Sequence, residues 1–292
     1  MTDALALPHL VSTQWLADHL GGSALLVVDA SVVAFTQPSG ANGYLSGHEQ
    51  YVLEGHIVGA VFADLIEEFS DTEGTYPFTR PQLAQFAAAA GALGVAPETT
   101  VVIYDTAVGQ WAARLWWLLR SFGHDRVAVL DGGLTKWKAE ERPVDLGHVV
   151  PPPAVFEGVE RPEFWADKAE VEAVVRGEIV ASLVCSVPPK EFTGELSPRS
   201  RAGHIPGSIS APAARLVNRE TNAALPAAAL RETFAHALGA PRLIVYCAGG
   251  IAATAAALAL TVLGETNVAV YDGSLNEWTA DPDAPLVTLA AS

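Results

Sequence analysis

The feature that most constrains the fold is an internal repeat, because the second half of the chain replays short words of the first half in the same order. The matched positions are His56 and His204, Asp105 and Cys247, Asp131 and Asp272, and Trp137 and Trp278. The first pair is separated by 148 residues and the others by 141 or 142. Solenoid repeats have far shorter periods, so the chain is expected to be a duplicated domain.

The duplication predicts two domains joined by a connector. We expect an N-terminal domain at 1–145, a proline-rich linker at 146–164 and a C-terminal domain at 165–292. The triplet Pro151-Pro152-Pro153 makes the linker semi-rigid. Half of the 292 residues are apolar, which is enough to bury two cores of ordinary size.

Within each half, apolar β-branched runs alternate with helical patterns. In the first half, the strands are predicted at 24–29, 100–105 and 127–131, and the helices at 13–20, 81–92 and 111–120. This alternation predicts an α/β fold in which each domain has a parallel sheet covered by helices on both faces. Ligands of such sheets bind beyond the carboxyl ends of the strands.

Cys247 lies at one of these ends. The run 243–246 predicts a buried strand, two glycines follow the cysteine, and an alanine-rich helix is expected to end at Gly264. Backbone N–H groups and the helix N-terminus then form a cradle that stabilises a thiolate, the nucleophilic form of cysteine. The cradle residues are expected to be Ala248, Gly249, Gly250, Ile251, Ala252 and Ala253. Asp105 cannot act as a thiol nucleophile, so catalysis is assigned to Cys247.

Composition excludes several functional classes. A net charge of −16 argues against binding a phosphate backbone, so no nucleic-acid partner is expected. Two cysteines are too few for a disulfide framework, and the first residues lack the pattern of a signal peptide, so a cytoplasmic location is expected. No apolar run is long enough to span a bilayer, and no His/Cys spacing suggests a metal, so neither a membrane partner nor a metal or cofactor is predicted.

The whole chain resembles a tandem-domain rhodanese, the family that contains thiosulfate and 3-mercaptopyruvate sulfurtransferases. The resemblance rests on the words Gly-His56-Ile, Ala-Ala-Arg-Leu-Trp-Trp117, Leu-Asp-Gly-Gly133, Gly-His204-Ile-Pro-Gly-Ser and Tyr-Asp-Gly-Ser274. It implies that Cys247 takes a sulfane sulfur from thiosulfate or 3-mercaptopyruvate, becomes a persulfide, and passes the sulfur to cyanide or a thiol. It also implies that the first domain keeps the fold without the cysteine.

The active loop departs from both common subtypes of the family. Thiosulfate-type loops usually read Cys-Arg-Lys-Gly-Val-Thr-Ala and mercaptopyruvate-type loops Cys-Gly-Ser-Gly-Val-Thr-Ala, whereas this loop reads Cys-Ala-Gly-Gly-Ile-Ala-Ala over residues 247–253. Members also tend to place an arginine where this chain has Glu191, while Arg199 matches the second anion-binding arginine of the family. The sequence therefore predicts sulfur transfer but does not identify the donor.

Four further residues are candidate substrate contacts. Arg199, Arg201 and Lys190 belong to one long segment of the second half, and an anionic donor needs a cation near the thiolate. The family resemblance adds a possible role for His56 at the active cleft. Because His56 and His204 occur in both copies, a structural role for these histidines is the alternative.

The second cysteine, Cys185, ends its own predicted strand at the position where the first copy has Asp29. The simplest interpretation is a small buried packing residue. The alternative is a resolving thiol that attacks the Cys247 persulfide, which requires that the two sulfur atoms can meet.

Two hypotheses from different classes remain. In the first, the chain is a cysteine-dependent sulfurtransferase, as the retained cysteine in a glycine-rich loop favours. In the second, it is a rhodanese-like binding or regulatory module with a degenerate loop, as Ala248, Gly249 and Glu191 favour.

Overall fold

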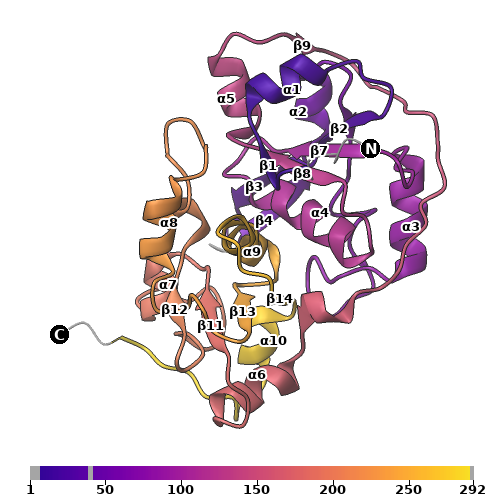
Figure 1. Cartoon of the computed structure of the whole chain (residues 1–292). Coiled ribbons are helices and arrows are strands. Elements are labelled where there is room, and N and C mark those ends of the chain that lie inside the picture. The colour runs from indigo at the N-terminus through magenta and orange to yellow at the C-terminus, as the bar shows by residue number, and fades with distance from the viewer. Residues whose placement is uncertain (1–6, 39–41, 290–292) are drawn as a thin grey trace.

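A computed structural model describes residues 7–38 and 42–289 and shows two similar lobes side by side (Figure 1). Each lobe is built around a five-stranded sheet. The predicted α/β class with two tandem domains is therefore confirmed. The signal-peptide prediction falls partly on residues 1–6, which lie outside the described residues.

The N-terminal sheet has the strand order β1-β8-β7-β2-β6, and all neighbouring strands are parallel. Its strands are β1 (Leu10–Val11), β2 (Leu25–Asp29), β6 (Val61–Phe62), β7 (Thr100–Tyr104) and β8 (Val127–Leu130). Two antiparallel pairs flank it: β3 (Val32–Thr36) with β4 (Asn42–Ser46), and β5 (His56–Ile57) with β9 (Val144–Asp145). The central strands are apolar along most of their length because helices cover both faces of the sheet.

The C-terminal sheet repeats this arrangement with the order β10-β14-β13-β11-β12, again with parallel neighbours. Its strands are β10 (Trp165–Ala166), β11 (Ser182–Cys185), β12 (Ile209–Ser210), β13 (Leu243–Tyr246) and β14 (Val268–Tyr271). Strands β7 and β13 occupy the same central place in the two sheets. Asp105 and Cys247 are consequently the first residues beyond equivalent strand ends.

The helices also occur in matching sets. The N-terminal domain contains α1 (Thr13–His19), α2 (His48–Glu54), α3 (Leu83–Ala92), α4 (Gln110–Ser121) and α5 (Gly133–Ala139). The C-terminal domain contains α6 (Lys168–Val175), α7 (Pro189–Thr193), α8 (Ala227–Thr233), α9 (Ile251–Val262) and α10 (Ser274–Ala280), with short 3-10 turns η1 (Pro162–Phe164) and η2 (Ala213–Arg215). Ser12 caps α1, because its side chain accepts the N–H of Trp15. Helix α3 begins two residues after Pro81, later than the sequence predicts.

Helices α4 and α9 hold the two domains together, and they lie against each other between the sheets (Figure 1). Trp111, Trp116 and Trp117 on α4 are almost fully buried in an apolar core that also includes Leu258 and Leu260 of α9. Full burial of one large apolar side chain stabilises a fold by roughly 1.5–3 kcal/mol. The domains therefore stabilise each other rather than acting as independent units.

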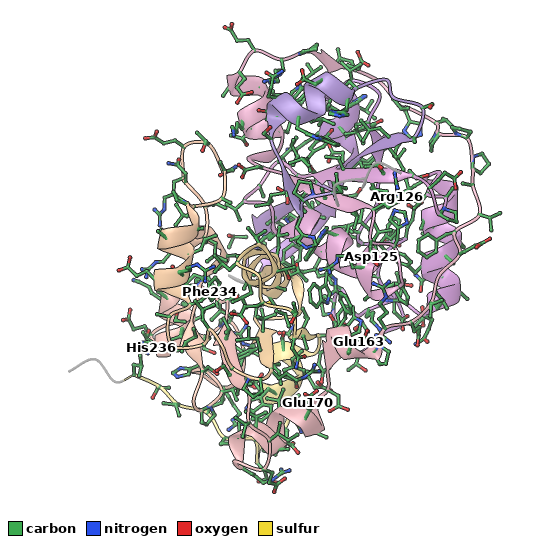
Figure 2. All side chains as sticks on the ribbon, in the orientation of Figure 1. Asp125, Arg126, Glu163, Glu170, Phe234 and His236 are labelled. Atoms are coloured by element: carbon green, nitrogen blue, oxygen red, sulfur yellow. The ribbon has the colours of Figure 1, made fainter. Side chains whose placement is uncertain are left out.

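The connector runs along the N-terminal domain without regular structure until η1. The N–H of Ala154 donates to the carbonyl of Gly91 at 2.8 Å, and Arg161 donates two bonds of 2.8 Å to Asp125, which Figure 2 labels. These bonds fix its path, while the predicted domain limits stay a prediction. Within residues 7–38 and 42–289, none of the helices has the length and apolar character needed to cross a bilayer.

Candidate active site

Cys247 is the first residue after β13, at the carboxyl edge of the C-terminal sheet, and only 2% of its surface is exposed. Its backbone is fixed on both sides. The N–H of Cys247 donates to Oγ of Ser274 at 3.1 Å, and its carbonyl accepts the N–H of Leu275 at 3.0 Å. The carbonyl of Ala248 accepts the N–H of Asn276 at 2.9 Å. The start of α10 thus clamps the loop that carries the thiol.

The loop ends at Gly250, which caps the twelve-residue helix α9 with a φ of 81°. A Cβ at this position would lie 2.6 Å from Oδ1 of Asp272, so both the backbone angle and the space favour glycine. The N–H groups of Ala248, Gly249 and Gly250 have no oxygen acceptor in the described part of the chain. These donors and the positive end of α9, roughly half a charge, can stabilise a negatively charged sulfur.

In the first copy, a side chain of the protein fills the equivalent cradle. Oδ1 of Asp105 accepts the N–H groups of Ala107 and Gly109 at 2.8 and 3.0 Å. Its Oδ2 accepts those of Trp111 and Ala112 at 2.9 and 3.0 Å. Burial raises the pKa of Asp105, and the four N–H bonds act in the opposite direction. A loop of this design can therefore surround an acidic group with backbone donors.

The N-terminal domain also contributes to the surroundings of Cys247. Arg114 on α4 is 1% exposed, and its Nη1 donates to Oδ1 of Asp272 at 2.6 Å and to the carbonyl of Gly250 at 3.4 Å. Its Nη2 donates to the carbonyl of Phe78 at 2.7 Å. The backbone N–H of Arg80 donates to Oδ2 of Asp272 at 2.8 Å. The loop that carries the thiol is thus held at the interface between the two domains.

Ser274, Asp272 and Asn276 contact the loop but are not among the site residues that the sequence predicts. Ser274 has a φ of 51°, in the region that favours glycine, and the first copy has Gly133 there with a φ of 53°. Its Oγ donates to the carbonyl of Tyr271 at 2.7 Å while accepting from Cys247. The available signal was a change from Asp-Gly-Gly to Asp-Gly-Ser between otherwise matching words.

The chain is similar to known proteins along nearly its whole length. A model of the rhodanese-like domain matches residues 12–140 and 185–281. The chain belongs to the rhodanese family. This rhodanese is 32% identical over 286 residues to a 3-mercaptopyruvate sulfurtransferase of Escherichia coli O157:H7, covering 96% of this chain and 98% of the relative. It is 35% identical to the thiosulfate sulfurtransferase of Gallus gallus, covering 92% of each chain.

Among solved structures, SseA from Escherichia coli, described as a 3-mercaptopyruvate sulfotransferase, is similar with a TM-score of 0.80. The sequence identity is 30%, and the match covers 92% of this rhodanese and 99% of SseA. The family and the curated relatives make this rhodanese an enzyme of the sulfurtransferase class.

Of the three basic side chains predicted to bind the donor of this rhodanese, two are bonded to groups of the protein and one is exposed. Nη2 of Arg199 lies 2.7 Å from Oε2 of Glu191, and their side chains are only 11% and 10% exposed. Arg201 donates to the carbonyls of Asp281 and Ala284 at 2.5 and 2.6 Å, so it holds the carboxyl-terminal segment. Lys190 is exposed on α7. Roles in substrate binding stay predictions for all three.

His56 of this rhodanese is buried in β5, with Nδ1 3.0 Å from the carbonyl of Tyr51 and its ring stacked on Tyr51 at 4.0 Å. His204 repeats this geometry, with Nδ1 2.7 Å from the carbonyl of Phe192 and the rings 3.7 Å apart. The matching environments support the structural alternative for both. The contacts described for His56 lie within the N-terminal domain, so a role at the cleft stays a prediction.

Cys185 is fully buried and pairs with Tyr246 in the register of β11 and β13. Burial raises the pKa of the Cys185 thiol to about 12, although bonds with the Val187 N–H and the Tyr246 hydroxyl act in the opposite direction. A thiol with this pKa is protonated at neutral pH and is a poor nucleophile. The packing interpretation of Cys185 is therefore favoured, and its role as a resolving thiol stays a prediction.

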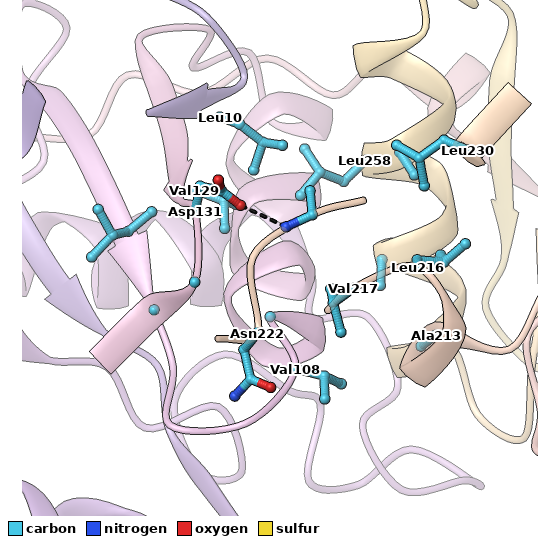
Figure 3. Close-up of a pocket in the computed structure, with 17 residues that line it drawn as sticks. Leu10, Val108, Val129, Asp131, Ala213, Leu216, Val217, Asn222, Leu230 and Leu258 are labelled. Carbon is cyan, nitrogen blue, oxygen red and sulfur yellow. Dashed lines mark hydrogen bonds between the residues drawn. The ribbon is translucent and has the colours of Figure 1, made fainter. Parts of the chain in front are cut away.

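A small pocket of about 50 Å³ lies between the domains, beside the loop that follows Asp105 (Figure 3). Val108 and Gly109 of that loop, Asp131, and Leu258 of α9 are among its lining residues. Asp131 is its one charged side chain among the described residues, so the pocket offers no cation to an anionic donor. In the described part of the chain, no group of three or more His, Cys, Asp or Glu side chains is placed to hold a metal ion.

Proposed function

We propose that this rhodanese transfers a sulfane sulfur through a persulfide on Cys247. The observation that carries the proposal is the contrast between the two cradles. In the first copy Asp105 takes the backbone donors, whereas the loop amides next to Cys247 have no oxygen acceptor among the described residues. A thiolate at this position, and then a persulfide anion, is the group that such donors stabilise.

The proposed reaction has two steps. The Cys247 thiolate attacks the outer sulfur of the donor, forming an S–S bond as the bond from that sulfur to the rest of the donor breaks. Thiosulfate then leaves as sulfite, while 3-mercaptopyruvate leaves as the pyruvate enolate, which takes up a proton to give pyruvate. In the second step, cyanide takes the outer sulfur as thiocyanate, or a thiolate takes it as a new persulfide, and the Cys247 thiolate is restored. Such a covalent intermediate predicts ping-pong kinetics.

We infer that 3-mercaptopyruvate is a better donor than thiosulfate. Thiosulfate is a compact dianion, and the positions after Cys247 are the uncharged Ala248 and Gly249. A lost hydrogen bond to a charged group costs about 1.5–3 kcal/mol. The single carboxylate of 3-mercaptopyruvate can instead be bound at a distance from the transferred sulfur, where Arg199 is the candidate.

The proposed partners are a small anionic sulfur donor and a thiol or cyanide acceptor. The low cysteine count supports the expected cytoplasmic location, which stays a prediction. No nucleic-acid partner is proposed, because the net charge of −16 opposes binding to phosphates.

Intact-mass measurement tests the proposal directly. The purified protein is incubated with thiosulfate or with 3-mercaptopyruvate, and peptide mapping locates any added sulfur atom. A single added sulfur on Cys247 that disappears when cyanide is supplied is the expected result. If neither donor loads Cys247, the rhodanese-like binding module becomes the better interpretation.

A further inference from the structure

Two partly buried arginine–carboxylate pairs involve carboxylates of the C-terminal domain. One joins Arg114 to Asp272 at 2.6 Å and ties the two domains together. The other joins Arg199 to Glu191 at 2.7 Å within the C-terminal domain. Each guanidinium is therefore matched by a carboxylate of the protein, and neither is a free cation.

The Glu191–Arg199 pair lies close to the strands that position Cys247. Helix α7, which carries Glu191, begins four residues after β11 ends at Cys185. Cys185 is in register with Tyr246, the residue before Cys247. The positive charge of Arg199 is also among the groups that act on the Cys185 thiol, where it opposes the dominant effect of burial on the pKa. The ion pair is thus within electrostatic reach of Cys185, at the end of the strand next to β13.

The bonding of Arg199 is incomplete. Its Nη2 donates to Oε2 of Glu191, but its Nε is buried and has no hydrogen-bond partner in the described part of the chain. A buried donor without an acceptor is costly, and a carboxylate ligand could satisfy it. The same ligand would meet the negative charge of Glu191, which lies against the same guanidinium.

We propose that Glu191 lowers the affinity for anionic donors by acting as the internal counter-ion of Arg199, so that an anionic donor has to compete with it. This inference rests on the proposed function only in naming the ligand as the sulfur donor. A net-neutral pair binds an anion more weakly than a free guanidinium does. Glu191 therefore weakens binding of 3-mercaptopyruvate and of other carboxylates without touching the sulfur that is transferred.

Alkylation of Cys247 by two similar reagents that differ in charge tests this inference without requiring turnover. Iodoacetate is anionic and iodoacetamide is neutral, and both alkylate a thiolate with loss of iodide. The rates of modification of Cys247 are measured by mass spectrometry in the parent and in Glu191→Gln, which keeps the side-chain shape. The variant is expected to raise the ratio of the iodoacetate rate to the iodoacetamide rate about tenfold, the effect of one charge-assisted contact. The KM for 3-mercaptopyruvate should fall by a similar factor while kcat stays the same.

Two controls separate the ion pair from general electrostatics. Glu195→Gln removes the same charge from an exposed position shortly after α7 and is expected to change the ratio less than about twofold. Glu191→Gln/Arg199→Gln should return the ratio to near the parent value, because the gain depends on the arginine. An unchanged ratio in a folded Glu191→Gln protein overturns the inference. So does an equal rise of the ratio in Glu191→Gln and Glu195→Gln. If the ratio rises but no donor ever loads Cys247, the anion site stands and the proposed function fails.

Discussion

The two halves of this rhodanese solve the same structural problem with different residues. After β7, the loop amides donate to the carboxylate of Asp105, whereas after β13 the loop amides next to Cys247 have no oxygen acceptor among the described residues. The first loop is also one residue longer, since its capping residue Gly109 lies four positions after Asp105 and Gly250 lies three after Cys247. One loop uses its backbone donors to bind its own carboxylate, and the other keeps donors that a sulfur anion could accept, as the proposed function requires.

Each domain also helps to close the loop of the other. The N–H of Arg80 donates to Asp272 at 2.8 Å, and the N–H of Ala224 donates to Asp131 at 2.7 Å. The charge partners differ between the copies. Arg114 reaches Asp272 from the opposite domain at 2.6 Å, whereas Lys136 lies 3.9 Å from Asp131 in its own domain. The two copies thus share reciprocal backbone contacts, whereas the Arg114–Asp272 ion pair crosses the domain interface and the Lys136–Asp131 pair does not.

The largest expected effect comes from the residue that distinguishes the two cradles. Cys247→Ser should lower sulfur transfer at least about a thousandfold, because a hydroxyl does not form a persulfide. Activity with both donors and the midpoint of unfolding are measured together. Cys185→Ser is the matched control and should keep single-turnover loading, because burial raises the pKa of the Cys185 thiol to about 12 and keeps it protonated at assay pH. Loss of loading in folded Cys185→Ser protein would contradict the packing role.

The next largest effect is expected at the Arg114–Asp272 ion pair, which joins the two domains. Arg114→Met leaves Asp272 without its buried partner and should lower the free energy of unfolding by about 3–5 kcal/mol. Lys136→Met at the other copy should cost less than about 1 kcal/mol, since that pair is longer and more exposed. Urea unfolding of both variants checks the difference. Similar losses of unfolding free energy in the two variants would show that the two ion pairs stabilise the protein equally.

A smaller effect is expected when the occupied cradle is disturbed. Asp105→Asn places an NH₂ group against backbone N–H groups and should destabilise the protein by about 1–3 kcal/mol. Sulfur loading of Cys247 should change little, because Asp105 belongs to the other domain. Asp71→Asn is the control, since Asp71 accepts a loop N–H only from Glu73 among its described side-chain bonds. A loss of loading without a loss of stability would mean that the two loops are coupled.

The smallest effect on stability is expected at Ser274. Ser274→Gly removes the hydroxyl that accepts from Cys247 but relieves a left-handed backbone that costs a non-glycine residue about 1–2 kcal/mol. The two effects oppose each other, so the unfolding midpoint should stay nearly constant. The rate of sulfur loading should fall several-fold, because the Cys247 N–H loses its acceptor. An unchanged loading rate would show that Ser274 serves the backbone alone.

The sequence by itself determined the duplication, the parallel α/β class and the place of Cys247 beyond a central strand, since these follow from local periodicity and from the spacing of repeated words. The tertiary structure decided how the side chains are used. Arg114 bonds to Asp272 across 158 positions in the sequence. Glu191 pairs with Arg199, which the sequence predicts as a donor contact. Cys185 proved to be buried beside Tyr246, which depends on strand register. Some of these contacts join residues that are distant in sequence. Others select one partner from several neighbouring side chains, and no local sequence pattern specifies that choice.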